Sequence, residues 1–157
     1  MYFFALKATG SPEEAQECVQ ELFVTLWNRR ERLGDVSQVK AYLFRSLRRL
    51  IHRHGSSRTA KAAHPIDDSV LLTFSPEDFL IRQEDASYQQ ETLAEVLNRL
   101  PPRQREAIYL KYYEDLSYSQ IAEVLRINYQ SAVNLVYQAF QQLRQQPTLR
   151  QLTRLAR

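Results

Sequence analysis

The sequence contains few of the residues that build metal sites, disulfides and sharp turns. Among its 157 residues there are one Cys, three His and three Gly. The lone Cys18 excludes an internal disulfide, and one Cys with three scattered His matches no recognised spacing of a structural zinc site. The Gly and Pro residues fall between periodic segments, which is typical of helices joined by short turns. We therefore expect an all-α protein without a bound metal.

Long apolar runs and catalytic motifs are also missing. No apolar run reaches the roughly eighteen residues that a membrane span needs. The start at Met1–Phe4 lacks the charged region and the cleavage site of a signal peptide. We expect no membrane insertion and a cytoplasmic location. Because there are no clustered carboxylates, no Ser-His-Asp pattern, no Gly-rich phosphate loop and no cofactor motif, we also expect no catalytic residue, no cofactor and no enzyme activity.

Positive charge is present but unevenly distributed. The formal net charge is only +3, yet residues 1–61 carry a balance of +5, residues 62–100 a balance of −6 and residues 101–157 a balance of +4. Two basic blocks joined by an acidic stretch suit a protein that places two surfaces on a polyanion while the connector stays away from it. An arbitrary distribution of surface charge is the alternative explanation.

Hydrophobic periodicity divides the chain into two small helical domains. It is clear before residue 55 and again from Leu93 to Leu100, whereas the residues between mix Ser, Ala, Pro and acidic groups. Within this stretch only Ser75-Pro76-Glu77 resembles a helix start. The predicted organisation is a first domain over residues 1–54, a linker over 55–86, a helix-turn-helix domain over 87–146 and a C-terminal tail over 147–157.

Helix boundaries in the first domain are well marked. Gly10 closes a short first helix, and Ser11-Pro12-Glu13-Glu14 opens the second with a capping residue followed by Pro. A third helix should extend from about Ser37 to His54, because no Gly or Pro interrupts it before Gly55. The side chains expected to face the core are Ala15, Cys18, Val19, Leu22 and Leu26 on the second helix and Leu43, Leu47, Leu50 and Ile51 on the third.

The segment from Ser117 to Leu143 predicts two helices with a sharp turn between them. Ser117 to Gln120 forms a capping box, and Asn128 caps a further helix after only a brief link, which is typical of a helix-turn-helix. Gln and Asn can bond adenine edges bidentately, and Leu can contact a thymine methyl. The expected buried face consists of Val133, Val136, Tyr137, Phe140 and Leu143. The expected groove-facing residues are Asn128, Gln130, Ser131, Asn134, Leu135, Gln138 and Arg144.

A cationic stripe is predicted on the third helix. Arg45, Arg48, Arg49 and His52 recur at helical spacing opposite the apolar face, and no acid occurs between Val36 and Ile66. Phosphates are the expected ligands, and an aromatic side chain nearby can stack on an unpaired base. A solvated basic face without a ligand is the alternative. Lys40 and Arg53, with Arg58 and Lys61, extend the stripe, and Tyr42 and Phe44 are the candidate stacking residues.

These motifs resemble, in both domains and in the right order, a bacterial RNA polymerase sigma factor of the extracytoplasmic-function type. The segment Ala15–Trp27 is similar to the family's polymerase-binding helix. Val39–Ser46 is similar to the helix that reads and melts the minus-10 element. Leu100–Glu106 together with the helix-turn-helix is similar to the domain that binds the minus-35 element. The resemblance implies contacts of Glu17, Gln20, Glu21 and Trp27 with the clamp helices of the polymerase β′ subunit. It also implies three partners. These are core polymerase, which the chain contacts at the β flap as well, promoter DNA and an anti-sigma factor.

The sequence departs from the family pattern at several positions. Relatives usually have further residues before the position of Met1, so we expect either that the true start lies upstream or that Tyr2, Phe3, Phe4 and Leu6 form an exposed apolar edge. Arg49 replaces a common Asn. Arg126 replaces a Gly in the turn, where a left-handed backbone costs about 1 kcal/mol or more. Because Gln138, Gln141 and Gln142 occur where relatives often carry cations, weak intrinsic affinity for the minus-35 element is expected.

Two other functions are compatible with the pattern. A stand-alone helix-turn-helix regulator would normally dimerise on a two-fold operator and would not need the polymerase-binding helix. A helical adaptor that binds only protein would leave both basic surfaces indifferent to DNA. Binding to core polymerase separates the first of these alternatives from a sigma factor, and DNA binding across salt concentrations separates the second.

Overall fold

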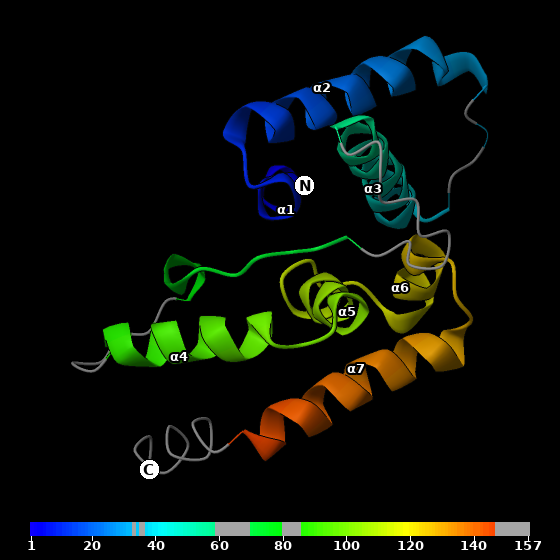
Figure 1. Ribbon diagram of the computed structural model, residues 1–157. Coiled ribbons are helices and arrows are strands. Elements are labelled where there is room, and N and C mark those ends of the chain that lie inside the picture. The colour runs from blue at the N-terminus through cyan, green and yellow to red at the C-terminus, as the bar shows by residue number, and fades with distance from the viewer. Residues whose placement is uncertain (33, 35–36, 59–69, 80–85, 147–157) are drawn as a thin grey trace.

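The computed structural model describes residues 1–32, 34, 37–58, 70–79 and 86–146 (Figure 1). The predicted tail over 147–157, most of the predicted linker and the basic residue Lys61 lie outside this range, as does the side chain of Arg58. In the part of the chain that the structure describes, all regular elements are helices, with seven α-helices and two short 3-10 helices. The all-α prediction is confirmed.

The first domain consists of α1 (Tyr2–Thr9), α2 (Pro12–Asn28), η1 (Arg30–Arg32) and α3 (Val39–Arg58). Gly10 ends α1 in the left-handed conformation, at φ 70. The side chain of Ser11 then accepts a hydrogen bond from the amide of Glu14, so both predicted boundaries are confirmed. Helix α3 continues past Gly55 to Arg58, beyond the predicted end at His54, because a single Gly weakens a helix without stopping it.

The second domain consists of α4 (Ala86–Asn98), α5 (Pro102–Tyr112), α6 (Tyr118–Leu125) and α7 (Tyr129–Gln145). The predicted capping box at Ser117 is present, with Gln120 as its second member. The side-chain oxygen of Asn128 accepts from the amide of Ser131 at 2.7 Å and caps α7. Helices α6 and α7 therefore form the helix-turn-helix that the sequence predicts.

The turn between α6 and α7 contains a left-handed residue. Arg126 has φ 54 and ψ 47, the backbone conformation that the sequence analysis associates with the common Gly. A side chain at such a position crowds the following carbonyl. The Arg126 side chain is exposed, so nothing in the core requires it.

We expect Arg126→Gly to raise the free energy of unfolding by about 0.5–1 kcal/mol. Gly relieves the strain of the left-handed backbone in the folded state. This stabilisation exceeds the loss of stability caused by the higher conformational entropy that Gly gives the unfolded chain. Chemical denaturation of the two proteins measures the difference. The control is Arg99→Gly, which places Gly after α4, where φ is not positive, and is expected to have no stabilising effect. A destabilised Arg126→Gly protein would contradict the expectation.

The predicted linker is not an open tether where the structure describes it. Residues 70–79 run between the two domains (Figure 1), and Val70, Leu72, Phe74 and Phe79 are buried. The predicted helix start at Ser75 opens the short η2 (Pro76–Asp78) with a capping box. Apolar side chains alternate along Val70–Phe74, so an extended segment buries one face against the domains.

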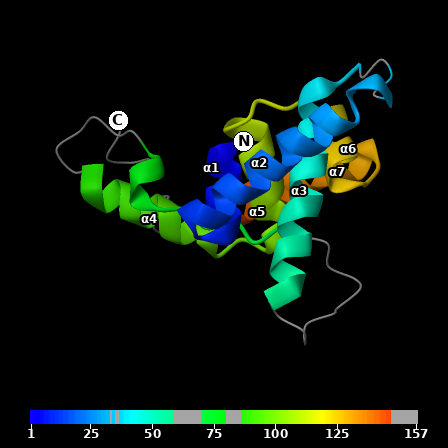
Figure 2. The same cartoon turned by 90° about the horizontal axis from the view of Figure 1, so that it is seen from above.

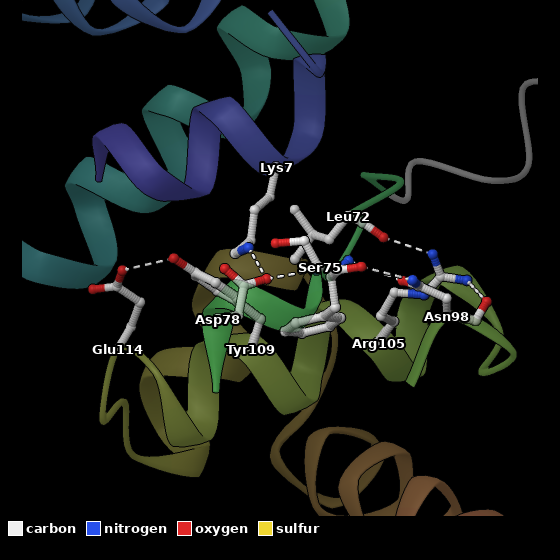
Figure 3. Close-up of polar contacts among 9 residues, drawn as sticks. Lys7, Leu72, Ser75, Asp78, Asn98, Arg105, Tyr109 and Glu114 are labelled. Carbon is white, nitrogen blue, oxygen red and sulfur yellow. Dashed lines mark hydrogen bonds and ion pairs between the residues drawn. The ribbon is translucent and has the colours of Figure 1, made fainter. Parts of the chain in front are cut away.

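Hydrogen bonds attach this connecting segment to both domains. The amide of Thr73 donates to the carbonyl oxygen of Lys7 in α1 at 3.1 Å. Asn98 of α4 forms a pair of bonds with the backbone of Phe74, accepting at 2.9 Å and donating at 2.8 Å. Lys7 also pairs with Asp78 (Figure 3). The connecting segment therefore joins the two domains into one packed unit.

A shared aromatic cluster fills the space between α1 and α5. Helix α1 lies above α5 in Figure 1, and the two helices overlap in the view from above in Figure 2. The ring of Phe4 lies 5.5 Å from that of Phe44 and 5.5 Å from that of Tyr109. Phe4 is fully buried, so the predicted exposed edge is wrong at this residue, because the second domain covers it. Tyr2 and Phe3 are exposed, as expected, and Leu6 is partly buried.

Candidate nucleic-acid and partner interfaces

The outer face of α2 carries the predicted polymerase contacts. Glu17 and Gln20 are exposed, and Trp27 is 68% exposed, an unusual value for the only Trp of the chain. Phe23 and Val24 are also exposed there, although the sequence analysis did not single them out. Their spacing opposite the buried face of α2 is the signal that could have identified them. An exposed apolar strip of this kind is typical of a protein-binding surface.

Glu21, the fourth predicted contact, is tied to α3. Its carboxylate accepts a hydrogen bond from Nε2 of His54 at 2.8 Å and pairs with Arg53. The bond from His54 and then the one from Arg53 hold the pKa of the Glu21 carboxyl below its usual value. Glu21 therefore stays charged and connects the outer face of α2 to the cationic face of α3.

The cationic stripe of α3 is exposed only in part. Arg49 and Arg53 are exposed, and the side chains of Lys40 and Arg45 are 47% and 40% exposed. His52 is partly buried. Arg48 is 3% exposed, so its predicted place on an open face is wrong. The second domain packs over that side of α3 and buries the guanidinium.

Phe44 is also misplaced by the sequence analysis, which offered it as a stacking residue. It is 1% exposed and makes an edge-to-face contact with Phe4 in the core. The helical period brings Phe44 to the same side as Leu47 and Ile51, which are buried as predicted. Tyr42, the other candidate, is only partly buried and remains available for stacking.

A groove of about 490 Å³ lies between α2 and α3, and three of the exposed or partly exposed cations of the α3 stripe line it. Arg45, Arg49 and Arg53 line it from α3, and Arg29 lines it from the C-terminal end of α2. Tyr42 and Ser46 add an aromatic ring and a hydroxyl. Sequence reasoning missed Arg29 because it lies outside the stripe and reaches the groove only through the packing of two helices. Four guanidinium groups beside an aromatic ring suit the backbone and bases of a single DNA strand.

Acidic side chains of the second domain approach the stripe from the other side. Oε2 of Glu114 lies 3.6 Å from Nζ of Lys40, and Oε1 of Glu123 lies 3.9 Å from Nη1 of Arg45. Glu106 of α5 pairs with Arg48 at 2.7 Å. The sequence analysis found no acid between Val36 and Ile66, but these three acids come from distant parts of the chain and supply the missing partners.

Helix α7, the predicted recognition helix, presents most of the predicted polar side chains in its N-terminal half, and Arg144 lies in its last turn. Asn128, Gln130, Asn134, Gln138 and Arg144 are exposed, whereas Ser131 and Leu135 are half-buried. The side-chain amide of Gln130 donates to Oδ1 of Asn134 at 3.1 Å, so these two exposed amides lie side by side. A shallow hollow of about 290 Å³ is lined by Arg103, Ile127, Ser131, Asn134, Leu135 and Gln138.

The buried face of α7 is rotated from its predicted position. Tyr137 is 62% exposed, so its predicted burial is wrong, and Val133, Phe140 and Leu143 are only partly buried. Val136 is buried as predicted, and Ala132 and Ala139 complete the buried centre. Small Ala side chains allow α7 to approach α5 and α6 closely. A pattern that counts only large apolar residues does not identify these Ala residues as buried.

Among the residues that the structure describes, no group of His, Cys, Asp and Glu could hold a metal ion. No helix in these described segments is long and apolar enough to cross a membrane. Burial and the neighbouring Glu21 and Glu17 raise the pKa of Cys18, which disfavours its thiolate.

Comparison with known proteins points to one family. Residues 1–60 match the family described as sigma-70 region 2, and residues 90–143 match the one described as sigma-70, region 4. The chain is 29% identical over 129 residues to the ECF RNA polymerase sigma factor SigL of Mycobacterium tuberculosis, covering 81% of this chain and 71% of that protein. It is 25% identical over 152 residues to the RNA polymerase sigma factor SigV of Bacillus subtilis, covering 97% and 87%.

A solved structure supports the fold. The sigma factor RpoE of Bartonella quintana, determined in complex with the anti-sigma factor NepR, is similar with a TM-score of 0.63 at 22% identity, over 90% of this chain and 86% of that one. The two family matches together cover more than half of this chain, in the order of the two helical domains. The protein therefore belongs to the sigma-70 family and is an RNA polymerase sigma factor of the extracytoplasmic-function type.

Proposed function

We propose that the two domains divide promoter recognition between them, with residues 1–54 binding core polymerase and the minus-10 element and residues 87–146 binding the minus-35 element. The observation that carries the proposal is the arginine-lined groove between α2 and α3, next to the exposed apolar face of α2. The arrangement lets a single rigid pair of helices hold the polymerase and a melted DNA strand at the same time.

In the proposed minus-10 site, the DNA strand enters the groove that Arg29, Arg45, Arg49 and Arg53 line. Each phosphate contact releases counterions, and Tyr42 offers a ring for base stacking. Lys40 and His52 extend the cationic surface along α3. Arg48 contributes only when the second domain moves away from α3.

In the proposed minus-35 site, α7 enters the major groove, with Gln130 and Asn134 reading base edges and Arg144 near a phosphate. The hollow at Leu135 suits a thymine methyl. Asn128, Ser131 and Gln138 complete this surface. Because most of these side chains are neutral, we expect selectivity without strong intrinsic affinity, and the polymerase-bound first domain supplies the remaining binding energy.

The remaining partners follow from the same assignment. The outer face of α2 is proposed to bind the clamp helices of the polymerase β′ subunit, and the second domain to bind the β flap. The similar structure contains an anti-sigma factor, which supports a partner of that kind here. Catalysis then belongs to the polymerase, and the place of action is the cytoplasm, where promoter DNA is located.

Transcription in vitro with core polymerase tests the proposal. We expect this chain to co-purify with core polymerase and to start transcripts at defined positions on a genomic library of promoter fragments. A chain that binds DNA only as a dimer, without polymerase, would instead indicate a stand-alone regulator. The exposed apolar face of α2 favours the sigma factor, because such a regulator has no use for it.

The groove predicts a specific defect in promoter opening. We expect Arg45→Ala combined with Arg49→Ala to slow open-complex formation about tenfold and to lower the salt slope of single-strand binding by roughly 1.4, since each lost phosphate contact accounts for about 0.7. Permanganate footprinting measures the rate of opening, and titrations of a single-stranded oligonucleotide across salt concentrations measure the slope. Polymerase binding should be retained. The control Arg99→Ala removes an exposed cation that follows α4, and it should leave both values unchanged. An unaltered opening rate in the double variant would contradict the assignment.

A further inference from the structure

The groove between α2 and α3 has two helical walls and an apolar floor. Leu22 of α2 and Leu50 of α3 are both buried and line it, and Leu26 is partly buried beside them. Its volume of about 490 Å³ falls within the range of roughly 300–1,000 Å³ that is common for small-molecule pockets. The groove therefore has the size and the lining of a site for a small ligand, in addition to a surface along which a DNA strand can lie.

Two exposed cations line the groove from opposite walls. Arg29 comes from the C-terminal end of α2, and Arg49 comes from α3. Among the described residues, no acidic side chain forms an ion pair with either of them, whereas Arg45 and Arg53 each have an acidic partner. An anion that lies between α2 and α3 therefore meets positive charge from both sides and displaces no carboxylate from Arg29 or Arg49.

An aromatic ring and two hydroxyl groups complete the lining. Tyr42 lies about one turn before Arg45 and about 16 Å along α3 from Arg53. Its ring can stack on a base, and the hydroxyls of Thr25 and Ser46 can donate hydrogen bonds to a sugar or a phosphate. The groove therefore combines a group that binds a base with groups that bind phosphates, at separate points along α3.

We propose that this groove is a binding site for a free nucleoside polyphosphate, whose base stacks on Tyr42 and whose phosphates lie between Arg29 and Arg49. Guanidinium groups bind phosphate oxygens through paired, charge-assisted hydrogen bonds. The bound nucleotide occupies the surface proposed for the minus-10 strand, so it competes with promoter opening. This regulatory consequence rests on the proposed function, whereas the binding itself does not.

Titration of the full chain with a ribose-labelled fluorescent ATP tests the site without polymerase. We expect saturable binding of one molecule per chain. Unlabelled ATP should displace the probe about tenfold more effectively than adenosine or tripolyphosphate, because each fragment lacks either the phosphate contacts or the stacked base. Absence of saturable binding would overturn the site. Equal displacement by tripolyphosphate and ATP would also overturn it, because such a result indicates a general attraction of polyanions.

Two sets of variants separate the site from a general loss of structure. Arg29→Ala combined with Arg49→Ala should weaken binding of the probe about tenfold or more. The control Arg99→Ala removes an exposed cation outside the groove and should leave binding unchanged. Tyr42→Leu should weaken binding of ATP about tenfold and leave that of tripolyphosphate unchanged, a difference that misfolding does not produce, and Tyr42→Phe should restore the affinity. Full affinity in Tyr42→Leu would contradict the stacked base.

Competition with DNA is measured on the same free chain. ATP should displace a fluorescent oligothymidine from the wild type, since both occupy one groove. Simultaneous binding of the two ligands would overturn the competition. Failure of the wild type to start transcripts with core polymerase would refute the proposed function instead, and it would leave the nucleotide titration unaffected.

Discussion

Trp27→Ala is expected to reduce the affinity for core polymerase by about thirtyfold or more. Trp27 is 68% exposed on the outer face of α2, and Phe23 and Val24 extend the same apolar strip. Buried Trp residues at the centre of interfaces commonly contribute more than about 2 kcal/mol of binding free energy. The guanidinium of Arg30 lies 4.7 Å from the ring centre and helps to fix the indole in place. Fluorescence anisotropy with core polymerase measures the loss.

The matched control for this prediction is Tyr88→Ala. Tyr88 is an aromatic residue of α4 that is 58% exposed and lies outside the α2 face. It should leave polymerase binding within about twofold. Thermal unfolding of both variants should stay near that of the wild type, since neither side chain is buried. Retention of polymerase affinity by Trp27→Ala would remove the α2 face from the proposed interface.

Local chemistry explains why so much of the fold could be predicted from the sequence. Ser11, Ser117 and Asn128 each cap the helix expected of them, because an N-cap depends only on the next three residues. Pro102 likewise sets the first helical position of α5, because its fixed φ suits the start of a helix. Gly10 and Arg126 take the left-handed backbone where a turn demands it. All of these signals act over a few residues.

The errors arise where distant segments meet. Arg48 and Phe44 have the spacing of a stripe and a stacking site, but the second domain and α1 cover them. Nothing within α3 reveals that Glu106 will arrive from a position 58 residues away. Periodicity identifies which side chains share a face, whereas tertiary packing decides whether that face meets water.

The candidate site shows the same division. The exposed residues of α7 and most cations of α3 were identified from residue type and spacing, because exposed polar faces follow from the apolar face opposite. Arg29, Phe23 and the groove itself were missed, since a groove exists only once two helices pack. The docking of residues 70–79 was missed because a composition rich in Ser, Ala and acids obscures the short apolar alternation of Val70, Leu72 and Phe74.

Arg105→Ala is expected to cause the largest loss of stability among these substitutions, about 3 kcal/mol or more, with a fall in Tm of about 10 °C. Arg105 is 7% exposed, and its guanidinium donates to the carbonyl oxygens of Leu72 at 2.6 Å and Leu100 at 3.0 Å, and also to that of Asn98 (Figure 3). Burial lowers the pKa of Arg105 without removing the charge, so these bonds stay charge-assisted.

Truncation of Arg105 leaves several carbonyl groups without a donor, each costing about 1–3 kcal/mol where water is excluded. Arg105→Lys should recover part of the loss, because the ammonium group keeps the positive charge. It should not recover all of it, because only the planar guanidinium can donate to carbonyl groups of the connecting segment and of the end of α4 at the same time. The control Arg99→Ala breaks only an exposed pair with Glu95 and should cost less than about 0.5 kcal/mol. Calorimetry of the three variants measures the change in Tm. A fall of less than about 2 °C for Arg105→Ala would show that the connecting segment is held by its apolar side chains alone.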